Sequence, residues 1–337
     1  MTTIHRIACP IPFPLKTVNC YFINDACPTL IDAGVDTPES LAHIDAAIRR
    51  EGGSLGSVRR VIVTHAHTDH AGLAGRLADD FGCEVHIHHR DYPKFLGADD
   101  RQNHAYCQRF EDFLLHSGVP GDPARDQARA FVKRVAGLVA PLREPQLLSG
   151  GETFAFDDFE LRVAPTPGHS AGSISLLDDV QGILFSGDFL LEHITPNPVA
   201  EFGLPEGPND YGSLTNFTAS LQWLLEQNPT RVLPGHGAAF SQAGPRAAAI
   251  LAHFEKRQGQ VLRMVARRDA GQPGGDGLTP FQLACGLFPG LKEMAVFLGV
   301  SEAFAHLQRL EGAGHLESRQ TKGVRRWRLK SPSTVRE

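Results

Sequence analysis

Three imidazoles and a carboxylate fall within six consecutive positions, directly after an apolar run. The stretch THAHTDH contains His65, His67, Asp69 and His70. Imidazole nitrogens and carboxylate oxygens are the ligands that divalent zinc, manganese and iron accept in proteins. The spacing differs from that of a helical HExxH motif, so we expect a loop that spreads its side chains around more than one ion. The stretch therefore predicts a metal site.

Three later segments repeat one arrangement, in which an apolar strand ends at a glycine-flanked histidine or aspartate. ELRVAPTPGHS reaches His169, GILFSGD reaches Asp188, and TRVLPGHG reaches His236. Glycine permits a sharp turn and a close approach of the backbone at such a point. Each segment alone is equally compatible with an ordinary turn. Taken together, the four segments provide seven candidate metal ligands: His65, His67, Asp69, His70, His169, Asp188 and His236.

Alternating strands and helices must position these side chains. RRVIVT, residues 59–64, predicts a buried strand, and the apolar spacing over residues 71–81 predicts a helix, so the first motif lies on a strand-to-helix loop. We further expect strands near residues 4–9, 18–24, 28–32, 83–89, 153–156, 159–165, 173–178, 182–186 and 230–234, and helices near 38–51, 216–226 and 245–268.

Two segments lie outside this alternation. Residues 104–116 and 123–142 predict a helical insertion that either shapes the mouth of a cleft or only packs on the sandwich edge. A long loop rich in proline and glycine follows Asp188, and loops of this length often close active sites. Within it, His193 and Tyr211 are candidates for substrate binding, although a histidine in a loop is usually just solvated.

In their order and local context, these motifs resemble those of the metallo-beta-lactamase superfamily, whose two-metal members carry HxHxDH and then His, Asp and His. The resemblance covers roughly residues 10–245. It implies an α/β fold, a four-layer αββα sandwich with a small C-terminal winged-helix-like domain. It also implies a division of the ligands: His65, His67 and His169 on one ion, Asp69, His70 and His236 on a second, and Asp188 bridging both. Asp32 in TLIDAG is expected to orient a ligand histidine.

Differences from individual members of the superfamily disfavour some of its enzyme classes. Histidine directly after Asp69 disfavours antibiotic hydrolysis, and His67 stands where flavodiiron oxidases carry glutamate. PGHGAAF differs from the GHEYT of glyoxalase II, and the sequence contains neither its glutathione-binding tail nor the acidic motif and arm of RNase Z-type enzymes. The chain resembles the group of beta-lactamase-like protein 2, in which a winged-helix-like tail follows the catalytic domain.

A proline- and glycine-rich stretch, DAGQPGGDG, divides the chain into two expected domains. Residues 1–270 would form the catalytic domain, with its insertion at about 101–142, and residues 277–332 a winged-helix-like domain of three short helices and a hairpin. The last strand places Arg325, Arg326, Arg328 and Lys330 around Trp327. This segment could bind a phosphate backbone or stack a base, but a solvated wing with a packed tryptophan is favoured.

Composition bounds the class of protein. The 337 residues have a formal net charge of -5, which gives no general attraction to nucleic acid or to an anionic membrane. The six cysteines form no CxxC pair and are expected to be buried thiols. The sequence has no amino-terminal signal pattern and no apolar run of about 18 residues, so we expect a soluble, cytoplasmic protein. The oligomeric state is not predicted.

These observations together predict a two-metal hydrolase with zinc as the default ion and manganese or iron as alternatives. A hydroxide bridging the ions would attack, while Asp69 and Asp188 would orient it as catalytic residues. The expected substrate is a small thioester or carboxylic ester. Phosphodiester cleavage in RNA is the alternative that the basic wing would favour, and a mononuclear iron persulfide dioxygenase is a third.

Overall fold

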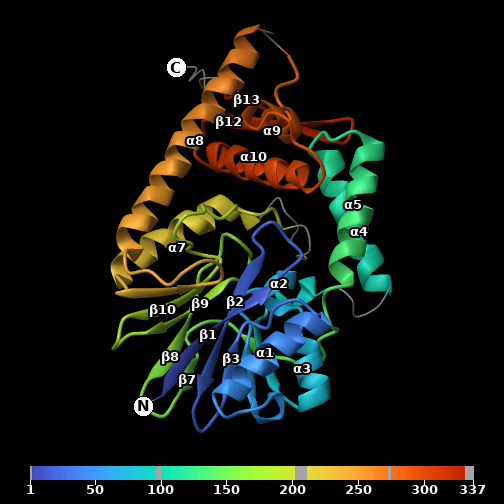
Figure 1. Ribbon diagram of the computed structural model, residues 1–337. Helices are drawn as coiled ribbons and strands as arrows, with labels where there is room; N and C mark the ends of the chain where they lie inside the picture. Colours follow the sequence, from blue (N-terminus) through green and yellow to red (C-terminus); the bar gives the residue numbers. More distant parts are fainter. Residues whose placement is uncertain (1, 96–99, 202–210, 272–274, 331–337) are drawn as a thin grey trace.

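The computed structural model describes residues 2–95, 100–201, 211–271 and 275–330, and two β-sheets packed face to face form its centre (Figure 1). The first sheet has the order β1-β2-β3-β4-β5-β6, antiparallel up to β3 and parallel from β3 onward. Its strands are β1 (Thr3–Pro10), β2 (Thr17–Asn24), β3 (Thr29–Ile31), β4 (Arg60–Ile62), β5 (Glu84–His88) and β6 (Gln146–Leu148).

The second sheet has the order β11-β10-β9-β8-β7, and only β10 and β11 are parallel. Its strands are β7 (Thr153–Ala155), β8 (Glu160–Pro165), β9 (Ile174–Asp178), β10 (Ile183–Gly187) and β11 (Arg231–Pro234). Because β10 and β11 run in the same direction, the residues that follow them, Asp188 and His236, emerge at one edge of the sheet.

Strand β2 explains why the sheets stack. Side chains alternate between the faces of a strand, and β2 is buried on both faces. Tyr21 and Ile23 point into the core between the sheets, where the ring of Tyr21 meets that of Phe185 edge-on at 5.2 Å. Cys20 and Phe22 point the other way, into the core beneath the helices. A strand that is apolar on both faces therefore requires a layer on each side.

Helices supply the two outer layers. On the first sheet lie α1 (Pro38–Arg50), the 3₁₀ turn η1 (Leu55–Ser57), the short helix α2 (Thr68–Ala71) and α3 (Ala74–Phe81); on the second lie α7 (Ser213–Gln227) and the long helix α8 (Ala243–Gly271). Thr37 caps helix α1, since its side chain accepts the Ser40 N–H, and the helix buries Ile44 and Ile48 one turn apart. The order of layers is helix, sheet, sheet, helix, which confirms the predicted αββα sandwich.

The helical insertion and the C-terminal segment pack against each other and share one apolar core. The insertion comprises the 3₁₀ turn η2 (Tyr92–Lys94), α4 (Asp100–His116) and α5 (Gly121–Ala136); the C-terminal segment comprises α9 (Pro280–Leu287), α10 (Met294–Gly312), β12 (Leu316–Thr321) and β13 (Val324–Leu329). Phe110 and Phe113 of α4 contact Phe297 of α10 edge-on, with ring centroids 4.7 and 6.3 Å apart. Figure 1 shows α4 and α5 flanking α10 at the end of the molecule away from the amino terminus.

Some predicted elements were wrong in detail. The second insertion helix ends at Ala136 and not at residue 142, with Gly137 as its C-cap. The C-terminal segment has two helices among its described residues and not three, because α10 continues through Gly299. A side chain there would lie 2.9 Å from Leu291 Cδ1, so glycine permits the close packing. The expectation that all six cysteines are buried was also wrong: Cys27 and Cys107 are half-buried and Cys285 is exposed. In the described part of the chain, no helix has the length and apolarity needed to cross a bilayer.

Candidate metal centre

The seven predicted ligands converge at one edge of the sandwich. The first motif follows β4, and His70 lies in helix α2. His169 follows β8. Asp188 comes directly after β10, and His236 comes two residues after the end of β11. Within the described residues, their ligand atoms form three overlapping groups, each with all atoms within 4.8 Å of one another: His65, His67 and His169; His65, His70 and Asp188; Asp69, His70 and His236.

The first group consists of three histidine nitrogens that face one another. His67 Nδ1 lies 2.9 Å from His65 Nε2 and 3.0 Å from His169 Nε2. Burial lowers the pKa of all three imidazoles, that of His67 to about 3, with further lowering from neighbouring imidazoles at His65 and His67. Neutral imidazole is the form that binds a metal ion.

We call Asp69, His70 and His236 the second group; together with Asp188, it adds carboxylates to the cluster. Asp69 Oδ2 lies 3.4 Å from His236 Nε2, and Asp188 Oδ1 lies 3.4 Å from His70 Nε2. The other oxygen of Asp188, Oδ2, lies 3.5 Å from His236 Nε2 and 3.7 Å from His169 Nε2. Asp188 therefore lies between the two groups. Burial alone would lower the pKa of His236, but Asp188 and Asp69 raise it to about 10.

Oxygen acceptors at the outer side of the rings fix their orientation. Carbonyl and carboxylate oxygens only accept, so the ring nitrogen facing each of them must carry the proton. His70 Nδ1 donates to Asp32 Oδ2 at 2.7 Å, His236 Nδ1 to the Thr17 carbonyl at 2.7 Å, and His169 Nδ1 to the Asn197 carbonyl at 3.0 Å. In the neutral ring each Nε2 is then a lone pair directed at the cluster, where a bound cation would take the place of the second proton. Asp32 has the predicted orienting role.

The donor atoms fit divalent cations. Three of them are buried and have no hydrogen-bond partner: His70 Nε2, Asp188 Oδ1 and His236 Nε2. Buried polar atoms without a partner carry a large desolvation cost, so native proteins satisfy them with another group or an ion. Imidazole nitrogens and carboxylate oxygens, with no thiolate among the seven, suit zinc, manganese or iron.

Two glycines let the strand ends approach each other. A Cβ on Gly235 would lie 2.5 Å from Asp188 Oδ1 and 2.6 Å from His70 Cε1. Gly187 has φ +49 and a Cβ there would lie 2.6 Å from Thr64 Oγ1. Both positions exclude side chains for reasons of space, as the predicted close approach requires.

Sequence reasoning missed a buried ionic network behind the first group. Asp91 accepts hydrogen bonds from the Ala66 N–H, between two ligand histidines, and from the Gly172 N–H and the Ser170 hydroxyl, just after His169. Lys94 bridges Asp91, at 2.5 Å, and Glu201, at 2.8 Å, and Glu201 accepts the Ala171 N–H. The network joins the two loops that carry the three-histidine group. HHRDYPK carries no motif that would have marked Asp91.

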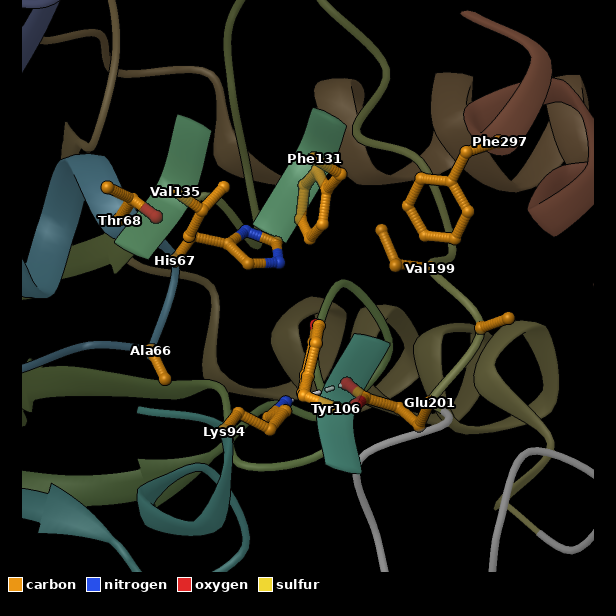
Figure 2. A pocket seen from close by; sticks show the side chains of 11 residues that line it. Ala66, His67, Thr68, Lys94, Tyr106, Phe131, Val135, Val199, Glu201 and Phe297 are labelled. Carbon is orange, nitrogen blue, oxygen red and sulfur yellow. Dashed lines mark hydrogen bonds and ion pairs between the residues drawn. The ribbon is translucent and has the colours of Figure 1, made fainter. Parts of the chain in front are cut away.

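A pocket opens beside His67. Figure 2 shows His67, Phe131, Val199 and Phe297 around a common space, with Lys94, Tyr106 and Glu201 along its other side. The apolar side chains come from α4, α5, the loop after β10, and α10. The insertion thus shapes the mouth of the cleft, one of the two roles considered for it, and α10 contributes to the same wall.

Neither of the two predicted substrate contacts lines this pocket. The His193 side chain is 84% exposed and pairs with Glu192, beside a different hollow lined by Gln242 and Arg246. Tyr211 is buried, and its hydroxyl donates to the Ser170 carbonyl at 2.9 Å. Tyr211 therefore supports the His169 loop, and its hydroxyl proton is directed at that carbonyl. The loop has no hydrophobic periodicity, so the sequence could not predict that His193 is exposed and Tyr211 is buried.

The basic strand near the C-terminus does not expose Trp327 to solvent. Trp327 is fully buried, packs edge-on against Phe304 and donates its Nε1–H to Glu311. Arg325 pairs with Glu311, and Arg328 pairs with Glu317. The alternative in which Trp327 stacks a base is therefore wrong, and the packed-tryptophan interpretation is correct.

Comparison with known proteins agrees with this geometry. Residues 14–236 match the family model of the metallo-beta-lactamase superfamily. "Probable metallo-hydrolase YqjP" of Bacillus subtilis is 29% identical over 92% of this chain and 93% of its own length. A beta-lactamase-like protein 2 homolog of Drosophila melanogaster is 24% identical over 79% of this chain and 75% of its own.

Two further matches bear on fold and chemistry. "Acyl-coenzyme A thioesterase MBLAC2" of Gallus gallus is 30% identical over 53% of this chain and 56% of its own. The crystal structure of the metallo-beta-lactamase family protein TTHA1429 from Thermus thermophilus superposes with a TM-score of 0.80, at 26% identity, over 97% of this chain and 98% of that one. The chain belongs to the metallo-beta-lactamase superfamily and is a metallo-hydrolase of that superfamily.

Proposed function

We propose that the protein hydrolyses small thioesters or carboxylic esters with a pair of divalent ions, zinc by default. His65, His67 and His169 would hold one ion, Asp69, His70 and His236 the other, and Asp188 would contact both. When bound, such ions lower the pKa of water toward about 7 and polarise a substrate carbonyl.

The aspartates of the cluster have separate roles in the proposed reaction. Asp188 has one oxygen toward His70 and the other toward His169 and His236, which suits a ligand shared by both groups. Asp69 offers a second carboxylate, 3.4 Å from His236 Nε2, which can accept a proton from the attacking water. Asp32 and the two carbonyl oxygens hold the imidazoles in place.

The single observation that supports an ester or thioester is the apolar pocket beside His67. Aromatic and aliphatic side chains dominate its wall, and its cation Lys94 is neutralised by two carboxylates. An acyl group suits such a wall, whereas the anionic backbone of RNA would gain more from a surface of free cationic side chains. The thioesterase name of one relative points the same way. RNA cleavage loses its main support because Trp327 is buried and two of the wing arginines are paired.

The test compares thioester, carboxylic ester and single-stranded RNA substrates, with metal content measured on the same preparation. We expect two metal ions per chain, hydrolysis of thioesters, and its loss in Asp188→Ala. His193→Ala is the matched control, because His193 is exposed and outside the cluster, and it should match the parent protein.

Three outcomes would contradict the proposal. One iron per chain would favour the mononuclear dioxygenase. RNA cleavage without esterase activity would favour the phosphodiesterase. Hydrolysis that survives Asp188→Ala would mean that the activity belongs to a contaminant.

A further inference from the structure

We propose that the pocket beside His67 binds the acyl chain of the substrate, and that the helical insertion and helix α10 together set the chain length it accepts. The inference rests on the proposed ester or thioester hydrolysis. It gives the C-terminal segment a role in substrate selection within the catalytic site.

The wall of the pocket is apolar and comes from distant parts of the chain. Phe131 and Val135 lie one turn apart on α5, so both face the pocket. Phe297 comes from α10, and Val199 from the loop after β10. The Phe297 ring lies 6.2 Å from that of Phe131, which closes the wall between insertion and C-terminal segment.

Several of these apolar side chains remain partly exposed although the molecule has packed apolar cores nearby. Phe131, Val135 and Val199 are each only half-buried, and Phe297 is 4% exposed. Apolar side chains around a hollow gain free energy when an apolar ligand excludes water from them. Their position beside a ligand histidine makes the chain next to the scissile carbonyl the group that would fill the hollow (Figure 2).

The polar side of the pocket favours a neutral chain. Lys94 is 10% exposed, and its ammonium group contacts both Asp91 and Glu201. Two carboxylates thus surround one ammonium, and this side of the pocket offers no excess positive charge to an anionic group. An unbranched or branched alkyl chain satisfies the pocket, whereas a phosphate or carboxylate on that chain does not.

Chain-length profiles of acyl thioesters from two to twelve carbons test the proposal. In the parent protein, each methylene that the pocket buries should raise kcat/KM about fourfold, until the pocket is full. Val199→Phe narrows the pocket, and the ratio of the rates for long and short chains should fall at least tenfold. Phe297→Ala widens it and should move the maximum to longer chains.

Leu298→Ala is the matched control, because Leu298 is the next residue of α10, is 40% exposed and does not line the pocket. It should keep the parent profile. Circular dichroism and metal content verify that each variant folds. If Phe297→Ala does not fold, the profile of Val199→Phe decides. Unchanged profiles, or an equal loss at all chain lengths, would overturn the proposal.

Titration calorimetry with n-alkyl carboxylates of the same lengths separates this proposal from the proposed function. Length-dependent binding that Val199→Phe abolishes, without hydrolysis of any ester, would support the pocket and contradict the reaction. Hydrolysis with a length profile that neither variant changes would support the reaction and contradict the pocket. Neither binding nor hydrolysis would contradict both.

Discussion

At the scale of single residues, the cluster depends on groups outside the seven candidate ligands. Asp91 is fully buried and accepts three protein N–H or O–H groups besides the Lys94 ammonium. These donors belong to the loop before His67 and to the loop after His169. A carboxylate is suited to this task because all its lone pairs accept, whereas an amide has donors on one side.

Asp91→Asn is therefore expected to weaken metal binding at the three-histidine group. The NH₂ group of the asparagine would face at least one N–H or O–H donor of the two loops, and the loops would separate. Losses of about 10- to 100-fold in affinity are typical for such outer partners. Chelator competition measures this, with Asp179→Asn as control, because Asp179 is an exposed carboxylate that pairs with Arg162 and is not part of the cluster. Equal affinities in both variants would show that Asp91 does not position the ligands.

Gly235→Ala tests the steric requirement at the second group. The added methyl would lie 2.5 Å from Asp188 Oδ1, so Asp188 or His70 must move. We expect loss of about one metal ion per chain, measured by elemental analysis, because the second ligand group depends on both residues. Gly244→Ala is the control, since its Cβ would meet nothing closer than 3.8 Å. Full metal content in Gly235→Ala would contradict the close-approach argument.

The clustering of the seven candidate ligands could be predicted from sequence because each lies in a short local pattern. An apolar strand followed by glycine and then histidine or aspartate specifies both the side chain and the edge where it emerges. Asp91 and Glu201 have no such pattern. Their role exists only after residues 66, 91, 171 and 201 come together in space, which no spacing along the chain encodes.

At the scale of elements, helix α10 illustrates where spacing misleads. Two short helices were expected where one helix runs through Gly299, and glycine stands there because a side chain would meet Leu291 at 2.9 Å. The same helix buries His306, whose Nδ1 donates to Gln258 Oε1 of α8 at 2.7 Å. Burial, with Arg257 nearby, lowers the pKa of His306 to about 3.

This shift makes stability depend on pH. Between about pH 6.5 and 3 the unfolded chain binds a proton at residue 306 and the folded chain does not, so stability is lost as the pH falls. From pH 6.5 to 5 the contribution is about 2 kcal/mol. Urea unfolding at pH 7 and pH 5 should show a smaller decrease for His306→Gln than for the parent protein. Identical decreases would mean that His306 titrates normally in the fold.

At the scale of the whole molecule, the insertion and the C-terminal segment form one apolar core above the cluster. The sequence predicted both segments, and the two-domain division remains a prediction. The sequence could not predict that the insertion and the C-terminal segment pack together, because their contacts join residues about 190 apart in the chain. These contacts follow from the path of α8, which carries the chain from the sandwich to the far end (Figure 1).

A double-mutant cycle measures this association. Phe113 of α4 and Phe304 of α10 pack edge-on with ring centroids 5.5 Å apart. We expect Phe113→Leu and Phe304→Leu to show a coupling energy of about 0.5–1.5 kcal/mol in urea unfolding. Phe304→Leu combined with Phe22→Leu, in the separate core beneath α1, should be additive. Additivity of the first pair would contradict a shared core.

Anomalous diffraction at the zinc absorption edge, from crystals of the protein purified without added chelator, locates the two proposed ions. We expect two peaks, one among His65, His67 and His169 and one among Asp69, His70 and His236, each about 2.0–2.2 Å from its ligand atoms and both beside Asp188. A zinc-loaded crystal with no peak among these residues, or with its peaks at other side chains, would contradict it.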